Sequence, residues 1–149
     1  MTFYNFYVFN RQGVCLYYRE WNRSHNPLKD NPAEDAKLVF GLLFSLKQFS
    51  VRMAPEPCVE GLQSFSTPDF TLHHLESATG YRFVMNTSKC TGTGVLEEFQ
   101  KTLKHIYSEI FVKLVMQNPL CKPNEPITLP SFAKKLDSYV ASVEKRITF

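Results

Sequence analysis

The chain has 149 residues, of which 44% are hydrophobic and 21% charged, and a formal net charge of +3. This length and composition indicate one folded domain over residues 1–149 and exclude a disordered chain. No Lys/Arg run exceeds two residues, so neither nucleic-acid binding nor a polybasic membrane contact is expected.

Two strands are expected at the start of the chain. Residues 3–9 are apolar at both odd and even positions, which is typical of a central strand covered on both faces. Residues 10–13 predict a turn, and residues 14–20 predict the partner strand of a β-hairpin. The polar stretch 21–30 is expected to be a loop.

Residues 31–53 predict a long amphipathic helix. Asn31 can cap it and Pro32 suits its first turn. One apolar stripe at helical spacing is expected to face the sheet, and it contains Leu38, Val39, Leu42, Leu43, Leu46, Phe49 and Met53. A second stripe lies beside it and leaves only a narrow polar face.

This second stripe consists of Phe40, Phe44 and Val51, and it has two explanations. Either a deeper pocket of the core buries it, or another protein covers it. We take the second explanation forward as a hypothesis. The residues expected to contact a partner are Lys37, Phe40, Phe44, Gln48, Val51 and Arg52.

The rest of the chain predicts three short strands, at 61–67, 70–77 and 81–87, and then two helices, at 95–117 and 129–142. Residues 143–149 are expected to be a loose tail. Because the second half of helix 95–117 is apolar nearly all round, we also expect partner contacts at Phe111, Val115 and Met116. The order β-β-α-β-β-β-α-α predicts an α/β (α+β) sandwich, whose five-stranded, mainly antiparallel sheet carries one long helix on one face and two on the other.

The sequence contains no clear pattern of a catalytic, cofactor or metal site. Four widely spaced cysteines, with no C-x-x-C pair and no signal-peptide pattern, indicate free thiols in a reducing cytosolic compartment. Cys90 before Gly92 and Gly94 lacks the rest of a phosphate-binding loop. His73 and His74 are adjacent on one strand, so they point to opposite faces and cannot chelate one ion; His73 is expected at the surface and His74 partly buried. No catalytic residue, cofactor or metal is therefore expected.

Several segments, taken together and in order, resemble one known family. They are NFYVFNRQGVCLYYREW at 5–21, KLVFGLLFSLKQF at 37–49, GYRFVMNT at 80–87, HIYSEIFVKLVMQNPLC at 105–121 and KLDSYV at 135–140. The chain is similar to the subunit 1 family of the transport protein particle (TRAPP), a sedlin-like branch of the longin-fold proteins. The resemblance runs nearly from end to end, although no single segment is a functional motif.

The resemblance implies a longin-like (SNARE-like, profilin-like) sandwich in a multisubunit tethering complex for vesicle traffic from the endoplasmic reticulum to the Golgi. It implies no active site in this chain, which would contribute surface to a composite exchange factor for a Rab GTPase of the early secretory pathway. The implied neighbours are a palmitoylated-type small subunit and a synbindin-like longin subunit. The implied location is cytoplasmic, peripheral at cis-Golgi and endoplasmic reticulum membranes through the complex.

Two other hypotheses remain open at this point. The chain could be a small longin-fold adaptor chain of a coat complex, since NRQG after an aromatic first strand also suits that class. It could also be a stand-alone thiol enzyme that uses Cys90 and the GTG loop. The identity of its neighbours would distinguish the adaptor chain, and substitution of Cys90 would test the enzyme.

Overall fold

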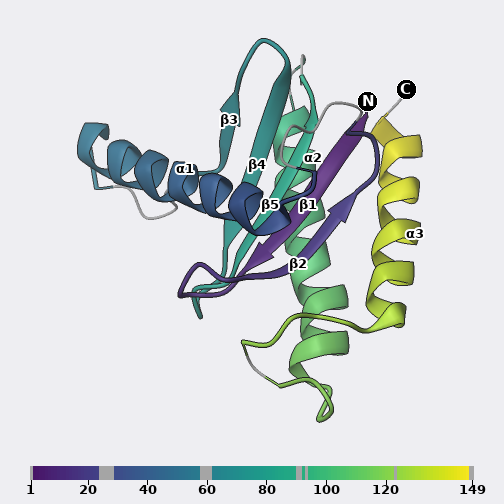
Figure 1. Cartoon of the computed structure of the whole chain (residues 1–149). Helices are drawn as coiled ribbons and strands as arrows, with labels where there is room; N and C mark the ends of the chain where they lie inside the picture. Colours follow the sequence, from purple (N-terminus) through teal and green to yellow (C-terminus); the bar gives the residue numbers. More distant parts are fainter. Residues whose placement is uncertain are drawn as a thin grey trace.

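The computed structural model of the chain describes residues 2–23, 29–57, 62–89, 92, 94–122 and 124–147. Figure 1 shows a single sheet with helices on both sides. The elements in chain order are β1 (Phe3–Phe9), β2 (Cys15–Glu20), α1 (Pro32–Met53), β3 (Ser64–Ser66), β4 (Phe70–Glu76), β5 (Arg82–Ser88), α2 (Val95–His105), the π-helix η1 (Ile106–Met116) and α3 (Pro130–Ile147). This order confirms the predicted succession of strands and helices.

The five strands form one antiparallel sheet in the order β2-β1-β5-β4-β3. β1 lies between β2 and β5, which confirms the central position predicted from its apolar residues on both faces. The β1–β2 pairing has a register shift between Val8 and Phe9. Gly13 closes the first hairpin with φ of 87°, a value that disfavours other residues.

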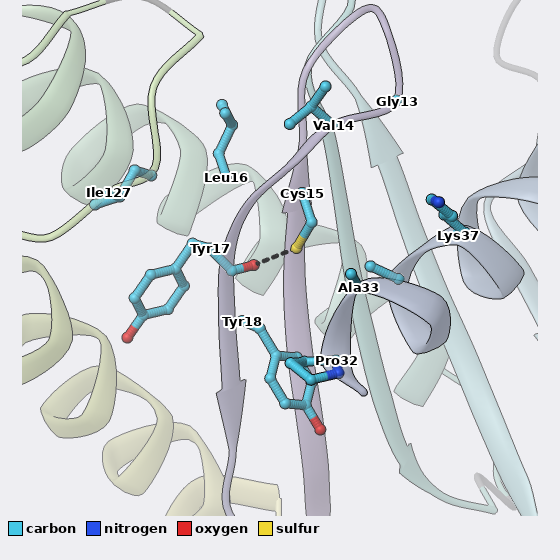
Figure 2. A pocket seen from close by; sticks show the side chains of 11 residues that line it. Gly13, Val14, Cys15, Leu16, Tyr17, Tyr18, Pro32, Ala33, Lys37 and Ile127 are labelled. Carbon is cyan, nitrogen blue, oxygen red and sulfur yellow. Dashed lines mark hydrogen bonds between the residues drawn. The ribbon is translucent and has the colours of Figure 1, made fainter. Parts of the chain in front are cut away.

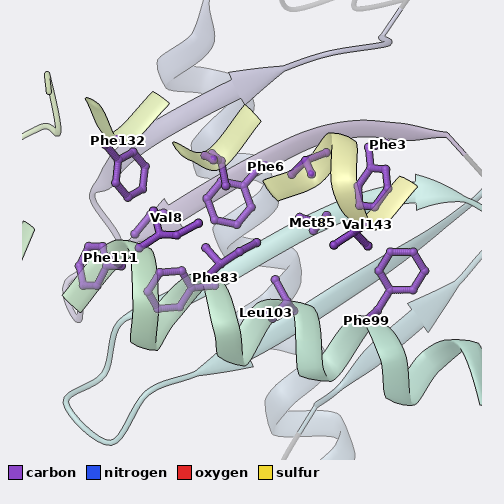
Figure 3. Close-up of a cluster of buried hydrophobic side chains, with 14 of the residues drawn as sticks. Phe3, Phe6, Val8, Phe83, Met85, Phe99, Leu103, Phe111, Phe132 and Val143 are labelled. Carbon is purple, nitrogen blue, oxygen red and sulfur yellow. The ribbon is translucent and has the colours of Figure 1, made fainter. Parts of the chain in front are cut away.

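The two faces of the sheet carry separate hydrophobic cores. α2, η1 and α3 cover one face, where rings from β1 and β5 meet rings from the helices, as Figure 3 shows for Phe6, Phe83, Phe99, Phe111 and Phe132. α1 alone covers the other face, over a smaller cluster. This arrangement of one long helix against two confirms the longin-like α+β sandwich predicted from the sequence.

The second long helix is continuous but changes its pitch. α2 ends at His105, and the chain continues as η1 without a break. The Ser108 hydroxyl donates to the Lys104 carbonyl at 2.9 Å, close to the change. A side chain that bonds to the preceding turn competes with the regular helical hydrogen bond, which favours a local widening.

The C-terminal segment corrects one prediction. Residues 143–147 are the last turn of α3 rather than a loose tail, and Val143 is 1% exposed. Val143 continues the buried stripe of Phe132, Leu136 and Val140, which explains why the helix runs on. Residues 148 and 149 lie outside the described part of the chain. Among the described residues, no helix is long and apolar enough to cross a membrane.

Candidate interaction surface

α1 begins as the sequence predicts. The Asn31 side chain accepts a hydrogen bond from the backbone N–H of Glu34 at 3.3 Å, and Pro32 occupies the first turn. Glu34 and Asp35 lie in the same turn, where negative charge offsets the positive end of the helix dipole.

Asp35 also fastens this end of α1 to the sheet. It accepts hydrogen bonds from the Tyr7 hydroxyl of β1 at 2.5 Å and, through both carboxylate oxygens, from the Arg23 guanidinium at 3.1 Å. Burial alone would raise the pKa of Asp35, but the hydrogen bonds from Arg23 and Tyr7 outweigh it and lower that pKa. Asp35 is therefore ionised and paired although it is only 6% exposed.

The face that α1 turns to the sheet contains only part of the predicted stripe. Its buried residues are Asp35, Ala36 and Leu43, of which Leu43 belongs to that stripe, and Val39 of the same stripe packs partly against the core. Large β1 side chains, Tyr7 and Phe9, form the core beneath α1, where Ala36, Leu43 and the ring of Phe40 pack on them. Most of the other members of the two predicted stripes are exposed.

Six large apolar side chains of α1 reach solvent, out of ten among the described residues of the chain. Their exposed fractions run from 38% to 67%, and the residues are Leu38, Leu42, Phe44, Phe49, Val51 and Met53. Together with the exposed polar residues Lys37, Gln48 and Arg52, we call them the α1 outer surface. In Figure 1 the C-terminal half of α1 extends past β3, beyond the edge of the sheet. Exposed apolar groups gathered on one element are typical of an interaction site.

The predicted partner residues of α1 divide into two groups. Lys37, Phe44, Gln48, Val51 and Arg52 are exposed and belong to the α1 outer surface.

Phe40 has a different environment from the rest of this set. It is half-buried, its ring centroid lies 5.7 Å from that of Phe9, and the Arg82 guanidinium lies 5.0 Å above it. The Phe40 ring also covers Gly13, where any Cβ would meet it at 2.7 Å. Phe40 thus packs at the end of the smaller core. For this residue, burial in the core is the explanation that applies, and not contact with a partner.

The three residues of the second long helix that were predicted to contact a partner differ in their exposure. Phe111 is 1% exposed and its ring contacts those of Phe83, Tyr81 and Tyr107, so its prediction as a partner contact is wrong. Val115 packs partly against the same core, and Met116 is 48% exposed at the end of η1. This helix has apolar residues nearly all round because it lies between the sheet and α3 and packs against both.

A groove of about 540 Å³ runs beside the start of α1, along the edge strand β2 (Figure 2). The loop residue Ile127 donates its backbone N–H to the Leu16 carbonyl at 2.8 Å, so this edge is partly covered by the chain itself. Cys15 lies in its wall and donates to the Tyr17 carbonyl at 3.3 Å. Burial raises the pKa of the Cys15 thiol to about 11, which makes it a poor nucleophile.

Reactive groups are otherwise scarce in the described part of the chain. His73 and His74 do point to opposite faces, but His73 is fully buried, so its expected surface position is wrong. Its ring stacks on Phe99 of α2 with centroids 4.1 Å apart, because α2 covers that face of β4. Among the described residues no three His, Cys, Asp or Glu side chains are placed to hold a metal. Cys90 lies outside the described residues.

Sequence reasoning missed Leu38, Leu42, Phe49 and Met53 as surface residues. Their spacing shows that they share a face, but not that this face lies outside the contact with the sheet. The one available signal was the number of apolar residues on α1, which exceeds what one side of a single helix can bury.

The sequence is similar to that of a known protein family over nearly its whole length. The model of the Sybindin-like family matches residues 3–143. Trafficking protein particle complex subunit 1 of Homo sapiens is 40% identical over 143 residues, which cover 96% of this chain and 94% of that protein. The protein of the same name from Dictyostelium discoideum is 32% identical over 139 residues, covering 92% and 93%. Among solved structures, Myxococcus xanthus MglB matches with a TM-score of 0.49 and 12% identity, covering 74% of this chain and 84% of that one.

Proposed function

This chain belongs to the Sybindin-like family, and we propose that it is a non-catalytic subunit of a TRAPP vesicle-tethering complex. The proposal rests on relatives named as subunit 1 of the trafficking protein particle, matched over nearly their whole length. In this role the chain acts by holding neighbouring proteins in place. The complex would work in transport from the endoplasmic reticulum to the Golgi, and the chain would be held peripherally at those membranes through its neighbours.

The α1 outer surface is the structural observation that supports this proposal. It places six exposed large apolar side chains on one helix, with Lys37, Gln48 and Arg52 beside them. Aromatic residues, Met and Arg are enriched in protein–protein interfaces, and this surface contains Phe44, Phe49, Met53 and Arg52. Each large side chain that a partner covers contributes roughly 1.5–3 kcal/mol of apolar burial before the costs of association.

Two neighbours are proposed, a palmitoylated-type small subunit and a synbindin-like longin subunit. The exposed apolar residues of α1 form two groups. Leu38, Leu42, Phe49 and Met53 lie on one side of the contact with the sheet, and Phe44 and Val51 lie on the other. Two groups allow contacts with two different proteins or with two parts of one protein. Met116, on the opposite layer, is a further candidate contact.

The assembled complex is proposed to promote nucleotide exchange on a Rab GTPase. Exchange requires tighter binding to the nucleotide-free GTPase than to the loaded form. A rigid subunit contributes by fixing the geometry of the composite surface that makes this distinction. The nucleotide would be held by the GTPase and its departure would need no catalytic group from this chain.

The experiment that tests this function is a native pull-down of the tagged full-length chain from cells, with mass spectrometry and an exchange assay on the eluted complex. Recovery of other TRAPP subunits together with Rab exchange activity is expected. Recovery of large coat subunits in their place would assign the chain to the adaptor class and overturn the proposal. A catalytic activity that the purified chain shows without partners and loses on Cys90→Ala substitution would identify it as a thiol enzyme and overturn the proposal.

A further inference from the structure

A groove of about 490 Å³ lies between the second long helix and α3, on the layer of the sheet opposite α1 (Figure 1). Three of its lining residues are lysines, against one glutamate, so its charge is positive. The sequence contains no long basic run, because the two helices bring together residues that lie far apart along the chain. We call this the basic groove, and the lining residues on which the argument depends are His105, Glu109, Lys113, Lys134, Lys135 and Tyr139.

The two lysines of α3 have no acidic partner on their own helix. Asp137, the acid nearest to them in the sequence, accepts hydrogen bonds from Arg19 at 2.8 Å and from Trp21 Nε1 at 2.9 Å, so its carboxylate is held toward β2. Lys134 and Lys135 are exposed, and they form no ion pair with any residue that the structure describes. Their ammonium groups are therefore available to an anion from outside the chain.

Glu109 shows how a carboxylate behaves in this groove. Lys113, four residues later on η1, donates a hydrogen bond to it, and this bond and the charge of Lys113 lower the pKa of Glu109. His105 and Lys135 lower that pKa further, Lys135 from the other side of the groove. The groove therefore favours the ionised form of a carboxylate, and a second carboxylate beside Lys134 and Lys135 would be stabilised in the same way.

Part of the wall of the basic groove is aromatic. The His105 ring, at the end of α2, stacks on the Tyr139 ring of α3 with centroids 4.2 Å apart and planes 18° apart. Both residues line the groove, and the methylene stems of the lysines add apolar surface beside them. A projecting side chain can enter such a groove between two helices, whereas a flat anionic surface such as a bilayer cannot. The wall thus favours a ligand that combines an apolar side chain with its negative charges.

We propose that the basic groove binds an acidic segment of a partner protein, in which an apolar residue lies between carboxylates. The carboxylates would pair with Lys134 and Lys135, and the apolar side chain would pack on the Tyr139 ring. Exposed ion pairs each contribute little to affinity, so the lysines act mainly by selecting an acidic partner and by speeding its association. The groove and the α1 outer surface lie on opposite layers, so both can be occupied at once, and this proposal does not depend on the proposed function.

The test uses the free full-length chain and the pentapeptide Glu-Glu-Leu-Glu-Glu, blocked at both ends, as the probe. Binding is followed by NMR through the ring signals of His105 and Tyr139 and the Cε signals of the lysines. The control peptide Gln-Gln-Leu-Gln-Gln lacks the charges, and Glu-Glu-Gly-Glu-Glu lacks the apolar side chain. We expect saturable shifts with the probe, weaker binding of the glycine peptide and no saturable shift with the glutamine peptide.

Two double variants locate the binding. Lys134→Gln/Lys135→Gln alters only exposed residues and should weaken the probe about tenfold, because each exposed ion pair contributes roughly two- to fivefold. Lys89→Gln/Lys145→Gln makes the same change of charge at exposed positions outside the groove, and should weaken the probe by less than about twofold. Equal weakening by the two double variants, or equal binding of the probe and the glutamine peptide, would overturn the proposal.

Flotation with phosphatidylcholine vesicles that contain phosphatidylserine distinguishes a peptide site from a membrane site. The chain should not float with these vesicles. Flotation that Lys134→Gln/Lys135→Gln abolishes would assign the basic groove to lipid and overturn the proposal. All of these measurements use the chain alone, so they can fail while the pull-down still recovers the other subunits of the complex.

Discussion

The hydroxyl of Tyr7, at the centre of β1, donates a 2.5 Å hydrogen bond to Asp35 in the first turn of α1. Both residues are buried, and the Arg23 guanidinium pairs with the same carboxylate. Burial first, then the hydrogen bond to Asp35, raises the pKa of Tyr7 well above its usual range, so Tyr7 stays protonated as the donor. This contact fixes where α1 starts on the sheet and hence which of its faces remain outside.

Asp35→Asn should destabilise the chain because it leaves the partly buried Arg23 without its counter-charge. We expect a loss of about 3 kcal/mol in the free energy of unfolding, at the lower end for a broken buried ion pair. Glu34→Gln, in the same helical turn but exposed, is the matched control and should change it by less than about 0.5 kcal/mol. Urea unfolding at neutral pH measures the free energy of unfolding of the two variants. Equal losses in both would show that the Asp35 contacts do not stabilise the fold.

The buried His73 should make the fold sensitive to acid. Burial lowers the pKa of His73 from 6.5 to about 4, so the unfolded chain binds a proton that the folded chain excludes. The contribution of His73 is therefore present above pH 6.5 and is lost as the pH falls toward 4, by about 3 kcal/mol in all.

Unfolding measured at several pH values between 7 and 4 tests this directly. His73→Leu should reduce the slope of the dependence in that window relative to the parent chain, because one titrating group is gone while the buried His74, whose pKa burial also lowers, remains. An unchanged slope in the variant would contradict the assignment.

Gly13 and Gly41 form a matched pair for backbone conformation. Gly13→Ala should cost about 1–2 kcal/mol from the left-handed backbone alone, and more because its Cβ would meet the Phe40 ring at 2.7 Å. Gly41→Ala, in the middle of α1 with no atom within 4 Å of the added Cβ, should stabilise by roughly 0.5–1 kcal/mol. Thermal unfolding should move in opposite directions for the two, and movement in the same direction would contradict the Gly13 geometry.

The end of α3 should be part of the core. Val143→Ala should lower the free energy of unfolding by about 2 kcal/mol, because two methyl groups leave a tightly packed site. Ser142→Ala, one residue earlier and exposed, should be nearly neutral. If Val143→Ala were also neutral, residues 143–147 would behave as the loose tail expected from sequence.

Much of this fold was predictable because the signals are local. Asn31 and Pro32 mark the start of α1, and the apolar residues on both faces of residues 3–9 place β1 inside the sheet rather than at its edge. The Tyr7–Asp35 contact was not predictable, since the two residues are 28 positions apart and neither has a sequence pattern of its own.

The orientation of α1 could not be predicted for a related reason. Periodicity shows which residues share a face, but the choice of face depends on the surface beneath the helix. The helix packs on the large Tyr7 and Phe9 side chains, and the Asp35 anchor fixes the rotation. Leu38 and Met53 consequently lie outside, where the sequence alone placed them inside.

The central claim is that the α1 outer surface contacts partners and does not support the fold. It is tested most directly by two double variants of the tagged chain, Phe44→Asp/Val51→Asp and Phe49→Asp/Met53→Asp, with Phe111→Asp as the core control. We predict that both double variants keep the thermal unfolding midpoint of the parent chain and no longer recover the other complex subunits, whereas Phe111→Asp fails to fold. Double variants that still recover the full complex, or that unfold like Phe111→Asp, would contradict the account.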